Sequence, residues 1–148
     1  MVRSAEPIAA TETRSHGARL VLELTPELPR ISGDAVQLQQ VLLNLVRNAV
    51  EAMVGTPPEA REVVVRTSME TPEQITVSVL DAGPPIDQAT LHGMFTPFYT
   101  TKPDGLGMGL AISLSIIEAH GGRLWAVSRE RAGLTVQFAL PLLRAGAA

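Results

Sequence analysis

Several residues in this chain have the types and spacing that bind a phosphate, a metal ion or a heterocyclic base. The segment Asp104–Ile112 places Gly105, Gly107 and Gly109 at alternate positions and then runs into an apolar pattern of helical period. Glycines in such a loop let backbone amides approach a phosphate at the N-terminus of a helix. Taken alone, the segment is equally suited to helix packing or to the flexibility of a lid.

Asn44 and Asn48 form a second candidate group, because residues four apart project from the same side of a helix. Their amide oxygens could bind a hard cation or phosphate-bound water. The apolar residues of the same helix recur every three or four positions on roughly the opposite side. These are Leu38, Leu42, Leu45, Val46, Ala49 and Met53. Read alone, the asparagines could also be two solvated residues on an exposed face.

Asp81 and Lys102 are the charged candidates. Asp81 ends an expected strand and precedes Ala82-Gly83, so its carboxylate can accept a hydrogen bond from an exocyclic amine or simply cap a turn. Lys102 follows the aromatic segment Phe95–Tyr99 and places a cation beside the glycine-rich loop. The aromatic residues either pin this long loop to the domain or form a separate hydrophobic cluster.

A regular series of elements must position these groups. Asp34 and Gln37 have the spacing of a capping box, so a long helix is predicted to start near Asp34. Residues 1–17 read as a frayed helix or tail that ends at Gly17. The remaining expected elements are strands over Ala18–Leu24, Val63–Thr67, Gln74–Leu80, Arg123–Arg129 and Leu134–Leu140, and a second helix over Gly107–Ala119. This order predicts an α/β (α+β) two-layer sandwich with one mixed sheet covered on one face by helices.

Composition excludes several classes of function. The 148 residues suit one domain, and a net charge of -3 with 3% aromatic residues argues against nucleic-acid binding. The chain has no cysteine, which excludes disulfides and thiolate catalysis and suits a cytoplasmic location. It carries no signal peptide and no apolar run long enough to span a bilayer, so any membrane attachment is expected outside this chain.

Four segments, read in order, resemble the catalytic ATP-binding domain of sensor histidine kinases. Asn44–Ala49 is similar to the N box, Asp81–Gly83 to the first glycine box, Phe95–Phe98 to the F box and Gly105–Gly109 to the second glycine box. Thr100–Leu110 and Glu118–Gly122 most resemble the nitrogen-regulation and oxygen-sensing branch of these kinases.

The resemblance runs from Ala18 to Pro141 and implies the Bergerat ATP-binding fold. In this fold a mixed, mostly antiparallel five-stranded sheet carries about three helices on one face. The ATP-binding catalytic domain would then occupy residues 18–141. Residues 1–17 would be a tail or the remnant of a linker helix, and residues 142–148 a disordered tail.

The family pattern implies that ATP and Mg²⁺ bind here and assigns a role to each matching position. Asn48 would be the magnesium ligand, Asn44 would lie near the metal and phosphates, and Asp81 would accept from the adenine amine. Lys102 would neutralise phosphate charge, which makes Asn44, Asn48 and Lys102 the implied catalytic residues. Thr135 would support the adenine edge through water. The implied nucleotide-binding set is Asn44, Asn48, Asp81, Gly83, Thr101, Lys102, Gly105, Leu106, Gly107, Met108, Gly109, Leu110 and Thr135.

Asn44 favours a kinase over an ATPase. ATP-hydrolysing members of the superfamily have a glutamate at the equivalent helical position, and an amide cannot act as a base toward water. The chain departs from the family pattern at Pro85, where the first glycine box has its second glycine, and at Glu51, where many histidine kinases have a lysine. Proline has no N–H and a restricted φ, so we expect the loop beside adenine to differ.

None of the histidines, His16, His92 or His120, has the sequence context of a phosphoacceptor. The chain therefore reads as the monomeric catalytic fragment of a longer kinase. Its expected partners are the dimerisation and phosphoacceptor domain and, through that domain, a response regulator. Two alternatives stay open: a degenerate docking module of the same fold, and a stand-alone serine kinase of the anti-sigma type.

Overall fold

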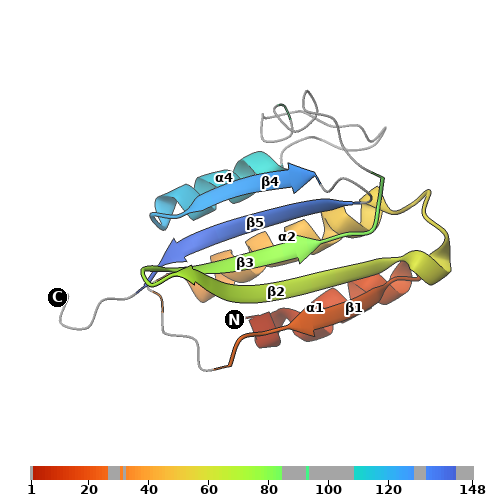
Figure 1. Cartoon of the computed structure of the whole chain (residues 1–148), viewed down its shortest axis with the longest axis horizontal. Helices are drawn as coiled ribbons and strands as arrows, with labels where there is room; N and C mark the ends of the chain where they lie inside the picture. Colours follow the sequence, from red (N-terminus) through yellow and green to blue (C-terminus); the bar gives the residue numbers. More distant parts are fainter. Residues whose placement is uncertain are drawn as a thin grey trace.

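The chain folds into two layers, a sheet and a set of helices that covers one of its faces (Figure 1). The structure is a computed structural model that describes residues 2–26, 31, 33–84, 93, 109–128 and 133–142. The sheet has five strands in the order β1-β2-β3-β5-β4. The β1–β2 pair is parallel, and the other pairs are antiparallel. The predicted mixed, mostly antiparallel sheet is confirmed.

The strands are β1 (Arg19–Glu23), β2 (Glu62–Thr71), β3 (Gln74–Leu80), β4 (Arg123–Ser128) and β5 (Leu134–Pro141). The helices are α1 (Val2–Ser15), α2 (Ala35–Ala52), the short 3-10 turn η1 (Pro58–Ala60) and α4 (Gly109–Ala119). The helices α1, α2 and α4 lie on the same face of the sheet (Figure 1). Each expected strand and helix is present within a few residues of its predicted bounds, and β2 extends further than predicted.

Helix α2 is the central element of the helical layer. It begins at Asp34, whose Oδ1 accepts from the backbone N–H groups of Val36 at 2.9 Å and Gln37 at 3.1 Å. This N-cap satisfies two of the donors that the first helical turn leaves unpaired. The buried side of α2 then packs on the sheet through Leu38, Val41, Leu42, Leu45, Val46, Ala49 and Val50.

Alternation along the strands supplies the other half of the core. In β5 the side chains of Leu134, Val136, Phe138 and Leu140 belong to the core cluster, and Val77 and Val79 of β3 join them. Residues in between point to the opposite face of the sheet, because side chains alternate along a strand. On that face Ser78 Oγ donates to Gln137 Oε1 at 3.0 Å. The period-two pattern of each strand thus determines which residues face the helices.

The N-terminal residues, expected to be a frayed helix or tail, form helix α1 and contribute to the core. Ala5, Ala9 and Thr13 are almost fully buried. Arg61 connects the turn after this helix to the turn after α2, since its guanidinium donates to the carbonyl oxygens of His16, Thr56 and Val54. Small side chains at every fourth position allow α1 to approach α2 closely. The sequence of alanines and threonines did not by itself indicate that this segment packs on another helix.

His120 connects the end of α4 to the start of α2. Its Nε2 accepts from the backbone N–H of Asp34 at 3.0 Å, and its Nδ1 lies 2.8 Å from the carbonyl oxygen of Ile116. The first contact requires an unprotonated Nε2, so Nδ1 carries the proton and donates to Ile116. In the predicted capping box, Gln37 would have bonded this N–H of Asp34. In the structure this N–H donates to His120 Nε2 instead.

The described chain ends beside β3. Leu142 forms an isolated antiparallel bridge with Ile31, and its N–H donates to the carbonyl oxygen of Glu73 at 3.0 Å. Residues 143–148 of the expected disordered tail lie outside the described residues. Across the part of the chain that the structure describes, no helix combines the length and apolarity needed to cross a bilayer.

We expect Gly122→Ala to destabilise the domain. A Cβ at this position would lie 2.3 Å from the carbonyl oxygen of Ala139, which is a backbone atom and cannot move aside easily. Overpacking of this kind costs about 1–3 kcal/mol. Gly55→Ala is the matched control, since nothing lies within 4 Å of a Cβ built there. Urea denaturation of both variants measures the effect, and equal unfolding free energies would contradict the expectation.

Candidate functional site

Asp81 lies where β3 ends beside the start of β5. Its side chain is buried, with 4% of the residue exposed. The Oδ1 atom accepts from the N–H of Gly83 at 2.9 Å and from the N–H of Leu134 at 3.2 Å. The backbone N–H of Asp81 in turn donates to the carbonyl oxygen of Leu134 at 3.1 Å. The carboxylate is therefore held in a fixed orientation by the turn after β3 and by the first residue of β5.

The turn after Asp81 packs against the C-terminal end of α2. A Cβ on Gly83 would lie 2.9 Å from the carbonyl oxygen of Ala52 and 3.2 Å from Asp81 Oδ1. The N–H of Ala82 points at the sulfur of Met53 at 3.4 Å. A glycine is required at position 83 because the helix and the carboxylate leave no room for a side chain. This close approach brings Asp81 next to the helix that carries the two asparagines.

Helix α2 contacts other elements at both ends of the stretch that carries the two asparagines. Asn44 bonds α4, and the carbonyl group of Ala52, at the C-terminal end of α2, contacts the turn after β3. Positions 44, 48 and 52 follow one another at helical spacing along one side of α2, over roughly 12 Å of the helix axis. Asn48 is half-buried and lies in the middle of this stretch. The structure thus places Asn44 and Asn48 on adjacent turns of α2, with the Asp81–Gly83 turn against the C-terminal end of the same helix.

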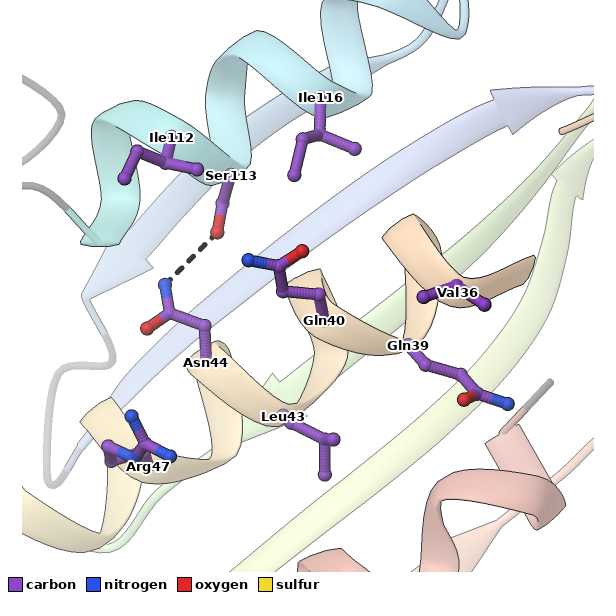
Figure 2. Close-up of a pocket in the computed structure, with 9 residues that line it drawn as sticks. All are labelled: Val36, Gln39, Gln40, Leu43, Asn44, Arg47, Ile112, Ser113 and Ile116. Carbon is purple, nitrogen blue, oxygen red and sulfur yellow. Dashed lines mark hydrogen bonds between the residues drawn. The ribbon is translucent and has the colours of Figure 1, made fainter. Parts of the chain in front are cut away.

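Asn44 bonds directly to the second helix. Its Nδ2 donates to the hydroxyl oxygen of Ser113 on α4 at 3.0 Å (Figure 2). The two residues line an open pocket of about 530 Å³ on the outer side of α2 and α4. The rest of its lining is Val36, Gln39, Gln40, Leu43, Arg47, Ile112 and Ile116. Asp81, Gly83 and Asn48 do not line this pocket, so it meets the candidate site at Asn44 alone.

Thr135 occupies a position on β5 opposite Leu80 and Val127. Its neighbours Leu134 and Val136 belong to the core cluster on the helical side, so Thr135 points to the other face of the sheet. The β5 residue that reaches Asp81 is Leu134, through its backbone N–H. This geometry favours Leu134 over Thr135 as the neighbour of a base bound at Asp81.

The glycine-rich loop and Lys102, to which the resemblance gives a role, fall largely outside the described residues. These positions are Thr101, Lys102, Gly105, Leu106, Gly107 and Met108, together with Pro85 and the segment Phe95–Phe98. Gly109 and Leu110 are described and form the first residues of α4. The start of α4 is therefore close to the Asn44–Ser113 contact, as expected for a loop that precedes a helix beside the asparagines.

The donor set suits Mg²⁺ bound together with phosphates. Mg²⁺ uses oxygen ligands, keeps several waters and is usually held by one or two protein groups plus the phosphates of a nucleotide. Asn44 and Asn48 offer such oxygens on adjacent turns of α2. Among the described residues no group of three His, Asp or Glu side chains could hold a metal ion by itself. The side chains therefore fit a metal that arrives with its nucleotide better than a resident metal.

A model of the histidine kinase-, DNA gyrase B- and HSP90-like ATPases matches residues 33–144. The chain belongs to this family. It is 40% identical over 141 residues to the sensor protein FixL of Bradyrhizobium diazoefficiens, an alignment that covers 95% of this chain and 28% of FixL. The chain thus spans less than a third of this relative.

Solved structures agree with the assignment. The nucleotide-free catalytic domain of the histidine kinase ThkA is 32% identical, with a TM-score of 0.81 over 95% of this chain and 90% of that one. Full-length ShkA in complex with AMPPNP is 28% identical, with a TM-score of 0.82 over 98% of this chain and 30% of that one. ThkA is also known in complex with the response regulator protein TrrA. The chain is a histidine kinase catalytic domain in both sequence and fold.

We expect two substitutions at Asp81 to differ in their effect on folding. Asp81→Ala removes the acceptor of two backbone N–H groups, and an unsatisfied buried donor costs roughly 1–3 kcal/mol. Asp81→Asn retains an oxygen at the Oδ1 position and should lose less than about 1 kcal/mol. Chemical denaturation compares the two variants. Equal losses would mean that these two hydrogen bonds do not hold the turn.

Proposed function

We propose that this domain binds ATP with Mg²⁺ and transfers the γ-phosphoryl group to a histidine of a dimerisation domain. The observation that supports the proposal most is that one helix, α2, carries Asn44 and Asn48 and contacts the Asp81–Gly83 turn at its C-terminal end. ATP binding agrees with the family and with the AMPPNP complex of ShkA. Magnesium binding and the residue roles rest on the resemblance and on the donor chemistry.

The proposed site distributes its tasks along α2. Asp81, held by the N–H groups of Gly83 and Leu134, accepts from the exocyclic amine of adenine. Asn48 binds the metal, with Asn44 one turn away near the phosphates. Lys102, Thr101 and the glycines of the loop before α4 surround the phosphates, as the family pattern implies. Their geometry lies outside the described residues.

In the proposed reaction the bond between the γ-phosphorus and the bridging oxygen of ADP breaks, and a phosphorus–nitrogen bond forms to the acceptor imidazole. The chain's own residues hold the nucleotide and neutralise charge, which are the main catalytic contributions in phosphoryl transfer. Asn44 provides no base that could activate water, so the phosphoryl group is preserved for the protein acceptor. A response regulator is the proposed downstream partner, as the complex of ThkA with TrrA suggests for that relative. The cytoplasmic location and the monomeric state stay predictions.

Nucleotide binding tests the proposal directly. We expect calorimetric titration with AMPPNP to give binding that strengthens when Mg²⁺ is added, and Asn48→Ala to lose most of that increment while retaining the magnesium-free affinity. The reason is that Asn48 is expected to contact the metal and not the base. An absence of binding at millimolar nucleotide would leave the degenerate docking module as the better interpretation.

Base specificity tests the role of Asp81 separately. Asp81→Asn places an NH₂ group where the carboxylate would accept from the adenine amine, so ATP affinity should fall roughly tenfold or more. Guanine presents a carbonyl oxygen at the same position, so the affinity for GTP should stay the same or rise. Parallel titrations with both nucleotides measure the ratio. An unchanged preference for ATP would place the base elsewhere.

A further inference from the structure

The turn after β3 contains three consecutive backbone N–H groups, and each of them has a partner. The N–H of Asp81 donates to the carbonyl oxygen of Leu134 on β5, and the N–H of Gly83 donates to the carboxylate of Asp81. Between them, the N–H of Ala82 donates to the sulfur of Met53 at 3.4 Å. Ala82 is therefore the position in this turn whose N–H depends on the side chain of a residue from another element.

The end of α2 places Met53 for this contact. Met53 is the C-cap residue of the helix, and its backbone N–H donates to the carbonyl oxygen of Val50 at 3.1 Å. Its side chain is fully buried. A buried methionine packs as an apolar residue, and its thioether sulfur can also accept a weak hydrogen bond. The helical period of the sequence predicts Met53 as a core residue, and the structure adds the polar contact to this role.

The contact determines the orientation of the peptide group between Asp81 and Ala82. Because a peptide group is planar, the N–H of Ala82 and the carbonyl group of Asp81 rotate together. Rotation of this group would displace the next residue, Gly83, and its N–H would no longer point at Asp81 Oδ1. The carboxylate would then lose one of the two backbone N–H groups that orient it. The sulfur of Met53 thus stabilises the orientation of Asp81 through a single peptide group.

We propose that Met53 is a positioning residue for base recognition, which orients the carboxylate of Asp81 through the N–H of Ala82. This inference rests on the proposed function, because it concerns the contact between Asp81 and the exocyclic amine of adenine. Met53 acts through the turn and does not itself contact the nucleotide. It lies outside the four segments that resemble the family boxes.

Leucine removes the sulfur of Met53 with little change in side-chain volume, and such swaps are well tolerated in cores. Met53→Leu therefore tests the acceptor more than the packing. Met69→Leu is the matched control, because it makes the same exchange on β2 at a residue that is 37% exposed. An effect of Met53→Leu that is absent in Met69→Leu arises from the buried position at the end of α2.

The first experiment measures amide hydrogen exchange by NMR in the chain without nucleotide. We expect the amides of Ala82 and Gly83 to exchange about threefold faster or more in Met53→Leu, because loss of the acceptor favours local opening of the turn. Met69→Leu should match the parent chain. Unchanged exchange at Ala82, or an increase of the same size at Phe138 in the middle of β5, would overturn the inference.

The second experiment compares ATP with the triphosphate of purine riboside, which is ATP without the exocyclic amine. We expect Met53→Leu to weaken ATP binding about fivefold, the range of a single hydrogen bond, because the carboxylate that accepts from the amine is less well oriented. The affinity for the analogue should stay within about twofold of the parent chain. Equal weakening of both nucleotides would indicate a purely structural role and overturn the inference.

A double-mutant cycle tests whether Met53 acts through Asp81. Asp81→Asn already removes the acceptor of the amine, so its orientation no longer matters for ATP. In that background Met53→Leu should change the Kd for ATP by less than about twofold, which gives a coupling in the cycle. The same fivefold loss in both backgrounds would overturn the inference.

The outcomes separate this inference from the proposed function. A parent chain that binds neither nucleotide would overturn the proposed function and with it the link to adenine, whereas the exchange rates still decide whether Met53 holds the turn. If the parent prefers ATP to the analogue and Met53→Leu behaves like Met69→Leu, only the role of Met53 fails. Should Met53→Leu not fold, Met53→Ile carries the same expectation, because it also lacks an acceptor and has a similar volume.

Discussion

The packing of α2 against the sheet is the constraint on which the rest of the structure depends. Seven of its residues are buried, from Leu38 to Val50, and full burial of a leucine or valine side chain stabilises by about 1.5–3 kcal/mol. This apolar side can face only the sheet, so the rotation of the helix about its axis is determined. Asn44 is then directed to α4, where it bonds Ser113, and Asn48 follows on the next turn of the same helix. A chemical site arises there because core packing leaves the helix no other orientation.

Backbone groups hold the other half of the site. Asp81 is fixed by the N–H groups of Gly83 and Leu134, and Gly83 is fixed by its contact with the end of α2. These are contacts to main-chain atoms, which depend on the fold and not on the side chains of the neighbours. Asp81 can therefore keep its position while the surrounding sequence changes, provided that position 83 remains a glycine and the turn keeps its contact with Met53.

The sequence was sufficient for the elements, since these follow from local periodicity and spacing. The roles of the site residues come from the family resemblance and stay predictions. Three features required tertiary contacts that no local pattern contains. The burial of Ala5 and Ala9 in α1, the bond from Asp34 to His120 and the bond from Asn44 to Ser113 all join segments distant along the chain. The face of Thr135 could have been predicted, because alternation with Val136 and Phe138 already assigns it to the side away from the helices. The family pattern assigned Thr135 a role beside adenine. The strand geometry favours Leu134 for that role, because its N–H reaches Asp81.

Helices α2 and α4 are joined by polar contacts near both ends of α4. Near its start Ser113 accepts from Asn44, and just past its end His120 accepts from the backbone of Asp34. Between them Ile117 is fully buried in the shared core. Two directional bonds on either side of an apolar contact prevent both sliding and rotation of one helix on the other. The start of α4, and with it the anchor of the glycine-rich loop, is therefore held in a fixed position relative to Asn44 and Asn48.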